Sequence, residues 1–476
     1  MSNHWDVKDL IDWDKRIQEK VDEFGLRCFP QEFEVCDHTQ MLGMMAYSGM
    51  PSHYPHWSFG KAYEKTKTLY DYGVSGIPYE MVINSNPSIA YLMRDNSLCL
   101  QILTIAHVYG HNDFFRNNFT FRSTKPETVV QRFKAQAERI RKYVESPSIG
   151  QEQVEETLDA AHALSFQCQR NPAIRTLNRD EQVQQALRDA EVPYDEFERI
   201  HKRPEYQAPE LHKVPLEPDE NVLLFIRDYN PRLEEWQKDV LTIVDERARY
   251  FIPQMETKSM NEGWACYWHR KIMNSLDLPQ DIHMEFLVRH NQVVRPTPGQ
   301  LNPYYIGLKM WDDIVRRCDE PTPDEQDNPV YDKPGEELIF EIREVDRDVS
   351  FYRRFLTENL MREMDLFEYK ENSAKEYVID KISDEENWQA VKQTLIAQSG
   401  LGSLPVIRVI DADFGGKREL LLGHPGDGRE LDLGYAEKTM GHLHSLWGRK
   451  VHLETMLKGT LTRLTYNGEK FKQKAA

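Results

Sequence analysis

Apolar residues recur every three or four positions along most of residues 1–371, which predicts a mainly helical domain. Helices are expected at 5–24, 98–115, 127–144, 151–166, 223–251 and 260–276. An extended run at 79–93 is broken at Asn86-Pro87, and the acidic, proline-rich stretch 201–221 is expected to be a linker. This part of the chain is therefore expected to fold by packing helices around one core.

A shift in composition near residue 372 marks the start of a second domain. Apolar and polar residues alternate over 376–382, strands are also expected at 403–413, 417–425 and 450–466, with Phe414-Gly415-Gly416 as a hairpin turn, and helices are expected at 384–399 and 434–447. The order β-α-β-β-α-β is typical of a small ferredoxin-like domain. We therefore expect a mainly α-helical, catalytic domain over 1–371 and an α+β C-terminal domain over 372–476.

Two histidines interrupt the apolar face of the predicted helix LCLQILTIAHVYGHNDFF. Helical spacing puts five residues on one stripe, namely Leu100, Leu103, His107, His111 and Phe114. Imidazoles that are removed from water need hydrogen-bonded partners or a metal ion. The four-residue spacing lets both rings hold one ion, as in the HExxH helices of zinc enzymes.

The glutamate of the HExxH motif is absent, because Val108 follows His107. Two interpretations of His107 and His111 therefore stay open. Either the two histidines bind a divalent metal ion, with Zn2+ the expected ion, or they are core residues hydrogen-bonded to carboxylates or backbone.

A second cluster of polar residues lies on the predicted helix QEQVEETLDAAHALSF. Glu155, Asp159 and His162 fall beside its apolar stripe, because they are four and three residues apart. One carboxylate could replace the missing motif glutamate as general base, and His162 could orient a ligand or donate a proton. A charged helix surface is the second interpretation. The Asp159–His162 spacing also resembles the carboxylate helices of di-iron proteins, which is the third.

The predicted helix MNEGWACYWHRKIMNSL carries a glutamate in aromatic and apolar surroundings. A buried carboxylate needs a cation or hydrogen-bond donors. Two histidines and one glutamate hold the ion in a known class of catalytic zinc site, so Glu262 is the expected third ligand. His269, two turns further on, is expected to orient a ligand or donate a proton. The alternative for Glu262 is a salt bridge to Arg289 or Arg295.

Two further segments carry candidate substrate-binding residues. The segment YSGMPSHYPHWSF combines turn residues with aromatic rings, so it either covers a core or lines a pocket. Its candidate contacts are His53, His56 and Trp57. In RHNQVVRPTPGQLNPYY, His290 and Arg295 are suited to an anionic group of a substrate.

Composition restricts the class of protein. With 40% hydrophobic and 29% charged residues, the chain is expected to be soluble and globular. The net charge of -18 argues against general nucleic-acid binding. The charged N-terminus lacks a signal core, no apolar run reaches the roughly 18 residues of a membrane span, and the six cysteines form no CxxC. A cytoplasmic location is therefore expected. P-loop, dinucleotide-binding and serine-hydrolase motifs are absent from the sequence.

Several segments together resemble the SpoVR family, the stage V sporulation protein R group. They are MPSHYPHWSFGKAYE (50–64), INSNPSIAYLM (83–93), AHVYGHNDFFRNN (106–118), VEETLDAAHAL (154–164), NVLLFIRDYNPRLEEWQKDVL (221–241), MNEGWACYWH (260–269) and VIRVIDADFGGKRELLLGH (406–424). The resemblance implies a cytoplasmic bacterial or archaeal protein linked to sporulation and spore cortex formation, or to the stress response. It also implies genomic association with a PrkA-type serine kinase and a von Willebrand A-type protein. The EGWA segment resembles zinc-peptidase-like families as well, which implies a ligand role for Glu262.

Two main hypotheses of function follow. The first is a zincin-like hydrolase of amide or peptide bonds, in which His107, His111 and Glu262 hold Zn2+. The second is a non-catalytic regulator or scaffold that acts with the kinase and the von Willebrand A-type protein. Neither hypothesis predicts an oligomeric state.

Overall fold

The computed structural model divides the chain into two compact units. It describes residues 5–72, 80–170, 175, 177–190, 208–296, 301–322, 333–366, 369–371, 377–379, 385–426 and 428–475. The first unit combines Met1–Arg141 with Arg249–Ser403, and the second combines Lys142–Ala248 with Leu404–Ala476. The expected boundary at residue 372 stays a prediction about which parts can fold alone.

The first unit is mainly helical. In chain order its elements are α1 (Val7–Glu23), β1 (Gln31–Cys36), α2 (His38–Ala46), α3 (Trp57–Asp71), β2 (Glu80–Ile83), β3 (Ser88–Met93), α4 (Leu98–Asn117), η1 (Phe119–Thr124), most of α5 (Val129–Glu145), the end of α9 (Glu235–Glu256), α10 (Lys258–Ser275), α11 (Gln280–Val293), α12 (Pro303–Asp319), α14 (Gly335–Val345), α15 (Asp348–Phe355), α16 (Glu358–Glu363), β4 (Tyr369–Glu371), β5 (Tyr377–Ile379), α17 (Glu385–Gln398) and η2 (Gly400–Ser403). No helix in the described ranges is long and apolar enough to cross a bilayer.

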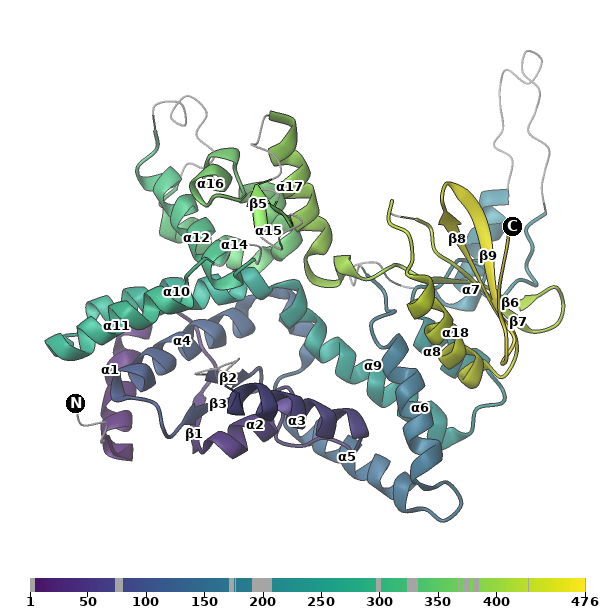
Figure 1. Cartoon of the computed structure of the whole chain (residues 1–476), viewed down its shortest axis with the longest axis horizontal. Coiled ribbons are helices and arrows are strands. Elements are labelled where there is room, and N and C mark those ends of the chain that lie inside the picture. The colour runs from purple at the N-terminus through teal and green to yellow at the C-terminus, as the bar shows by residue number, and fades with distance from the viewer. Residues whose placement is uncertain are drawn as a thin grey trace. The chain divides into compact units, whose positions relative to one another are not determined.

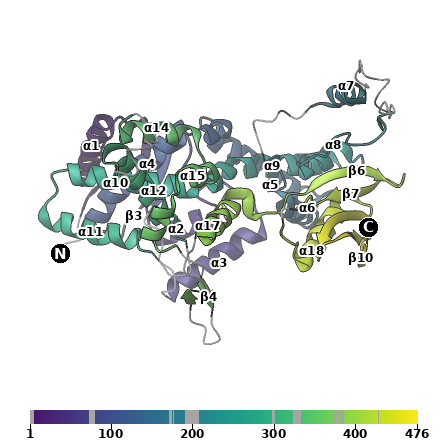
Figure 2. The same ribbon diagram turned by 90° about the horizontal axis from the view of Figure 1, so that it is seen from above.

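The second unit combines helices with a five-stranded mixed sheet (Figure 2). Its elements are α6 (Gly150–Leu164), α7 (Arg179–Ala190), α8 (Val222–Tyr229), most of α9, β6 (Arg408–Phe414), β7 (Glu419–Gly423), α18 (Leu433–Trp447), β8 (Val451–Leu457), β9 (Thr460–Tyr466) and β10 (Phe471–Ala475). The strand order is β10-β9-β8-β7-β6, in which only β7 and β8 run parallel. The helix between them, α18, packs against β8 and β9.

The ferredoxin-like strand order expected for residues 372–476 is not the one observed. Of the predicted first strand, 376–382, the structure describes 377–379 as β5, which pairs with β4 in a separate two-stranded sheet. The predicted last strand is two strands, because Lys458 and Gly459 both have positive φ and form the two-residue turn of a β8–β9 hairpin. A C-terminal α+β region is therefore confirmed, with a different sheet.

A small sheet lies beside α4 in the first unit (Figure 1). Its order is β1-β3-β2, with β1 parallel and β2 antiparallel to the central strand. The extended run predicted at 79–93 is confirmed as β2 and β3. The register pairs Glu80 with Leu92, which fixes Glu80 at the first position of β2, next to α4.

The histidine-bearing helix α4 is buried on almost every side, rather than along one stripe. It packs against α1, α10, α11 and α14, as well as β2 and β3. The Ser97 side chain caps its N-terminus by accepting a hydrogen bond from the Leu100 amide. Because the sequence of α4 is apolar on several faces, the helix forms the centre of the first unit's core.

Small residues let three helical backbones approach closely in this core (Figure 1). A Cβ added to Gly110 of α4 would lie 2.6 Å from the Cα of Ala265 in α10. On α10, a Cβ added to Gly263 would lie 2.4 Å from the Cα of Gly307 in α12. Both distances are shorter than any normal Cβ contact, so glycine is required where α10 meets its two neighbours.

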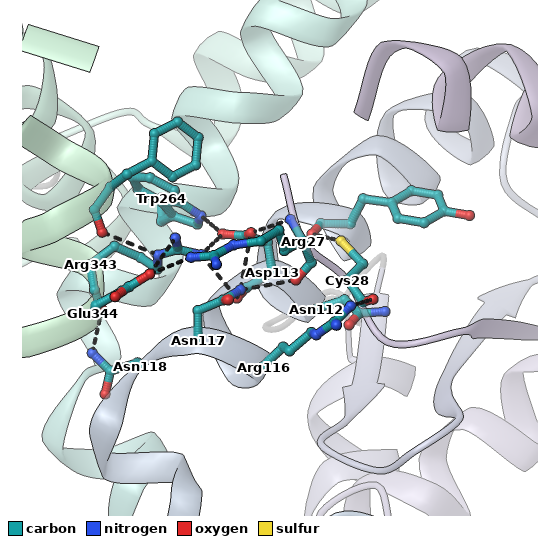
Figure 3. Close-up of polar contacts among 12 residues, drawn as sticks. Arg27, Cys28, Asn112, Asp113, Arg116, Asn117, Asn118, Trp264, Arg343 and Glu344 are labelled. Atoms are coloured by element: carbon teal, nitrogen blue, oxygen red, sulfur yellow. Dashed lines mark hydrogen bonds and ion pairs between the residues drawn. The ribbon is translucent and has the colours of Figure 1, made fainter. Parts of the chain in front are cut away.

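A buried ion pair joins α4, α10 and α14 (Figure 3). The Arg343 guanidinium donates to Asp113 Oδ2 over 2.7 Å, and both side chains are fully buried. The same oxygen accepts from Trp264 Nε1 at 2.9 Å, and Oδ1 accepts from the Arg27 amide at 2.7 Å. Burial of the two charges is tolerable because the carboxylate oxygens are each hydrogen-bonded.

The N-terminus of α10 is capped from outside the helix. Asp348, the first residue of α15, accepts from the backbone amides of Ser259 and Met260, at 2.9 Å each. These amides would otherwise lack intrahelical partners. Burial raises the pKa of the Asp348 carboxyl to about 7, against the effect of the two backbone donors. The cap fixes the start of the helix that carries Glu262.

Replacement of Gly263 by alanine should destabilise the protein. The added methyl group would force α10 and α12 apart, and overpacking of this kind costs about 1–3 kcal/mol. The matched control is Gly60→Ala in α3, where an added Cβ meets nothing within 4 Å, so this variant should be as stable as the parent or slightly more stable. Urea unfolding measures both, and equal destabilisation would contradict the close approach.

Replacement of Arg343 by methionine should cost about 3–5 kcal/mol, because it leaves the buried Asp113 carboxylate without its cation. Arg362→Met is the control, since Arg362 pairs with Glu358 on an exposed helix turn and such pairs contribute about 1 kcal/mol or less. The midpoints of urea unfolding compare the variants. Similar midpoints for the two would rule out a stabilising role for the buried pair.

Candidate metal centre

Four side chains from three elements of the first unit converge in its core. They are Glu80 from β2, His107 and His111 from α4, and Glu262 from α10, and one ligand atom of each lies within 4.8 Å of the others. Three of these residues were predicted as ligands from the sequence, and the structure brings them together. Glu80 is a fourth group that the sequence analysis did not identify.

The distances within this cluster suit one tetrahedral ion. Glu80 Oε1 lies 3.1 Å from His107 Nε2 and 3.7 Å from His111 Nε2. Glu262 Oε2 lies 3.9 Å and 3.4 Å from the same two nitrogen atoms. Nitrogen and oxygen ligands at about 2.0–2.1 Å from zinc stand about 3.3 Å apart in a tetrahedron. The four separations scatter around that value.

Electrostatics within the cluster favour charged groups on both sides. Burial would raise the pKa of the Glu262 carboxyl, but contact with His107 and His111 outweighs burial and lowers that pKa to about 2. Burial would also raise the pKa of Glu80, which the same two imidazoles lower. In turn, burial would lower the pKa of His111, but Glu262 and Glu80 raise it to about 10. Two carboxylates thus create a strong demand for positive charge.

The donor set fits a divalent ion in composition as well as distance. Oε2 of Glu80 and Oε2 of Glu262 are buried and, among the described residues, accept no hydrogen bond of normal geometry. Buried carboxylate oxygens without donors are costly, and coordination to a cation would satisfy them. Imidazole and carboxylate ligands together suit zinc, iron and manganese.

Hydrogen bonds at the far side of each ring orient the two histidines. Asn261 Oδ1 lies 2.9 Å from His111 Nδ1, so Nδ1 must carry the proton that is donated. His107 Nδ1 lies 2.7 Å from His269 Nδ1. In both rings Nε2 therefore faces the carboxylates. Such outer contacts are the usual means of fixing the orientation of ligand histidines.

The chain of imidazoles continues from His269 to a second helix. His269 Nε2 lies 2.8 Å from Nδ1 of His290 in α11. Burial, with the electrostatic effect of the neighbouring His107 as the next cause, lowers the pKa of His269 well below its usual value. Burial, with Arg270 as the next cause, lowers the pKa of His290 to about 4. His269 and His290, which were predicted in a catalytic and a substrate-binding role, are thus both buried next to the cluster.

A tyrosine hydroxyl also reaches the cluster. Tyr304, in the first turn of α12, has its pKa raised by burial and then by the negative charges of Glu262 and Glu80. A hydrogen bond with the Glu262 carboxylate contributes to the same shift. Tyr304 therefore keeps its proton over the physiological pH range and is a neutral donor beside Glu262.

Three predicted catalytic residues lie in the other unit. Glu155, Asp159 and His162 are on α6, and no group of potential ligands within the described ranges includes them. The Glu155 carboxylate accepts a hydrogen bond from Gln151 at one turn's distance. Their expected roles as general base and proton donor stay predictions.

The predicted substrate-binding residues of the aromatic segment form a ring cluster around the start of α3. His53 stacks on Tyr47 and contacts Phe59, with ring centroids 5.5 Å and 3.9 Å apart. His56 caps α3 by accepting from the Ser58 amide. Trp57 is 51% exposed, so it is the ring that a ligand could reach. Whether these residues bind substrate stays a prediction.

The salt bridge proposed as the alternative for Glu262 is not formed. Arg289 pairs with Glu285 one turn away on α11, and the exposed Arg295 follows the end of that helix. The anion-binding role expected of Arg295 stays a prediction. Glu262 Oε2 instead approaches the Nε2 atoms of His107 and His111.

The sequence gives only weak indications that Glu80 and Tyr304, which the sequence analysis missed, belong to the site. Glu80 is a charged residue at the start of an apolar strand that leads toward α4, and Tyr304 follows the Asn302-Pro303 start of α12. Glu80 and Tyr304 come close to the histidines only because β2 pairs with β3 in this register and α12 packs against α10. Neither arrangement can be derived from periodicity.

Comparisons with known proteins place the chain in a family. The SpoVR like protein pattern matches residues 4–404, and the SpoVR-like C-terminal domain matches residues 405–458. Uncharacterized protein YcgB of Escherichia coli (strain K12) is 36% identical over 458 residues, which cover 90% of this chain and 88% of that protein. No solved structure matches the chain. The chain therefore belongs to the SpoVR family.

Proposed function

We propose that this SpoVR protein is a zinc-dependent hydrolase of amide or peptide bonds. In this proposal His107, His111 and Glu262 hold the ion, and Glu80 is the general base. The observation that carries the proposal is the approach of two carboxylates to the same pair of buried imidazole nitrogens. One carboxylate completes a two-histidine, one-glutamate ligand set, and the other is available for proton transfer.

Glu80 takes the role of the glutamate that the HxxxH helix lacks. Val108 occupies the motif position on α4, but Glu80 reaches the same two imidazoles from the neighbouring strand. We assign the base to Glu80 and not to Glu155 or Asp159, because Glu80 belongs to the unit that contains the histidines and contacts them directly. Its buried Oε2 is the atom to accept a proton.

The remaining residues of the centre orient the ligand rings or donate a hydrogen bond. When bound, a zinc ion supplies a Lewis acid that polarises a carbonyl and lowers the pKa of water toward neutrality. His269 and Asn261 hold the ligand rings with Nε2 toward the carboxylates. The Tyr304 hydroxyl, which stays protonated, is placed to donate a hydrogen bond where negative charge develops.

A non-catalytic regulator or scaffold is the second candidate function, and one observation favours it. The four donor separations suit a tetrahedron made entirely of protein ligands, in which Glu80 is the fourth ligand. An ion held in that way has no position left for water, as in structural zinc sites. The two candidates differ in what Glu80 does, so a Glu80 variant separates them.

We extend the proposal to the biological setting that the family resemblance implies. The hydrolase would act in the cytoplasm during sporulation, in spore cortex formation, or in the stress response. A PrkA-type serine kinase and a von Willebrand A-type protein would be its partners. Pull-down of the native protein from cells that express all three genes would test the association.

Replacement of Glu80 by glutamine should separate metal binding from hydrolysis. Protein purified without a histidine tag is analysed for zinc by mass spectrometry and incubated with a peptide library derived from a proteome. Glu80→Gln should keep its zinc and lose hydrolysis by about 10²–10⁴-fold, the usual contribution of a general base. Glu262→Gln and His111→Ala should each lose about one zinc per chain.

The control is Glu358→Gln, which removes a carboxylate from an exposed helix turn and should change neither zinc content nor hydrolysis. If Glu80→Gln also loses about one zinc per chain, Glu80 is a ligand and the regulator hypothesis is favoured. If His111→Ala and Glu262→Gln bind as much zinc as the parent, both candidate functions fail.

Metal affinity should rise with pH, because a proton competes with the ion for His111. With a His111 pKa of about 10, the imidazole is protonated at neutral pH and must release its proton to coordinate. The apparent association constant for Zn2+ should therefore rise about tenfold per pH unit from pH 7 to 9, with about one proton released per ion. Calorimetric titration in two buffers of different ionisation enthalpy counts that proton. Binding heats that are identical in both buffers would contradict the charge state of His111.

A further inference from the structure

A second group of metal-binding side chains adjoins the first and shares one residue with it. His107 of α4 and Cys266 and His269 of α10 are all fully buried. One ligand atom of each lies within 4.8 Å of the other two. Cys266 is one helical turn after Glu262 and three residues before His269, so all three α10 residues share the face toward α4.

His107 is oriented so that its two ring nitrogens face different groups. Nε2 points to Glu80 at 3.1 Å, and Nδ1 points to His269 Nδ1 at 2.7 Å. An imidazole can coordinate one ion through each nitrogen, since the two lone pairs lie at opposite edges of the ring. His107 is therefore placed to bridge two ions.

His269 is oriented toward the same point. Its Nε2 is occupied by the hydrogen bond to His290, at 2.8 Å, so Nδ1 is the nitrogen left to face His107 and Cys266. A histidine whose far nitrogen is hydrogen-bonded in this way is the usual form of a metal ligand. A hydrogen bond over this short Nδ1–Nδ1 contact requires a proton on one of the two nitrogens, which an ion bound by both rings would replace.

We propose that His107, Cys266 and His269 form a second metal site, which makes the centre dinuclear, with His107 as the bridging ligand. This inference rests on the proposed function, because it adds a second ion to the same centre. Two imidazole nitrogens and a thiolate form a soft ligand set that selects zinc over magnesium, calcium or manganese. The second ion is therefore Zn2+, and Co2+ is its spectroscopic substitute.

The charges of the two sites are compatible with burial. Two carboxylates, Glu80 and Glu262, balance the first divalent ion. The second ion is balanced by the Cys266 thiolate and by His107 when it bridges as an imidazolate. A metal ion deprotonates a coordinating thiol outright, so the buried thiol needs no other base. The dinuclear centre is then neutral, which a fully buried position requires.

Titration of the metal-free, full-length protein with Co2+ tests the second site. The parent should take up two equivalents and develop a near-ultraviolet thiolate-to-cobalt charge-transfer band. Cys266→Ser should take up one equivalent and lack the band. The control Cys36→Ser removes another buried thiol, on β1, and should behave as the parent does. His111→Ala should lose the first equivalent and keep the band.

X-ray absorption by the zinc-loaded parent protein tests the same site without a substitution, in case Cys266→Ser does not fold. A zinc–sulfur scattering path at about 2.3 Å is the expected result. Uptake of one equivalent without a charge-transfer band, together with no sulfur path, would overturn the second site and leave the proposed function intact. Failure of the parent to bind any cobalt or zinc would overturn the proposed function as well.

Discussion

The candidate centre depends on the close approach of two helical backbones. Gly110 lies between the two histidines of α4, and it meets Ala265, three residues after Glu262, at a distance that excludes any larger side chain. This contact brings Glu262 within reach of both Nε2 atoms. Gly263 of α10 meets Gly307 of α12, so these two helices also approach closely. Helix α12 supplies Tyr304. Small residues next to the ligands thus determine the geometry, as much as the ligands themselves do.

Charged side chains are concentrated at two places in this core, and their charges are compensated in different ways. The Asp113–Arg343 pair is neutral and fully hydrogen-bonded, so it links three helices without any demand for a further ligand. Around His107 the balance is different, because two carboxylates face two imidazoles, and contact with these carboxylates raises the pKa of His111 to about 10 against the effect of burial. The first arrangement is complete as a structural element. The second leaves Oε2 of Glu80 and Oε2 of Glu262 without a hydrogen bond of normal geometry among the described residues, which is why it, and not the ion pair, is assigned a function.

Sequence patterns identified three of the four side chains that converge in the candidate centre, but little of their surroundings. His107, His111 and Glu262 were identifiable because polar groups on apolar helix faces need partners, and the structure brings these three together. Glu80 was not, because its position follows from how β2 pairs with β3, which involves contacts distant in sequence. The ferredoxin-like arrangement was wrong for a related reason: strand periodicity shows that a segment is extended, but not which strand it pairs with. The helical class of the first unit, which depends on local spacing alone, was predicted correctly.

The division of the first unit into two chain segments has a consequence for protein synthesis. Glu80, His107 and His111 precede the intervening residues Lys142–Ala248, and Glu262 follows them. A ribosome therefore completes the histidine pair long before the last acidic ligand has been translated. The nascent chain cannot assemble the full ligand set until α10 has emerged from the exit tunnel. An ion that needs all four side chains could therefore be bound only after both segments of the first unit have been translated.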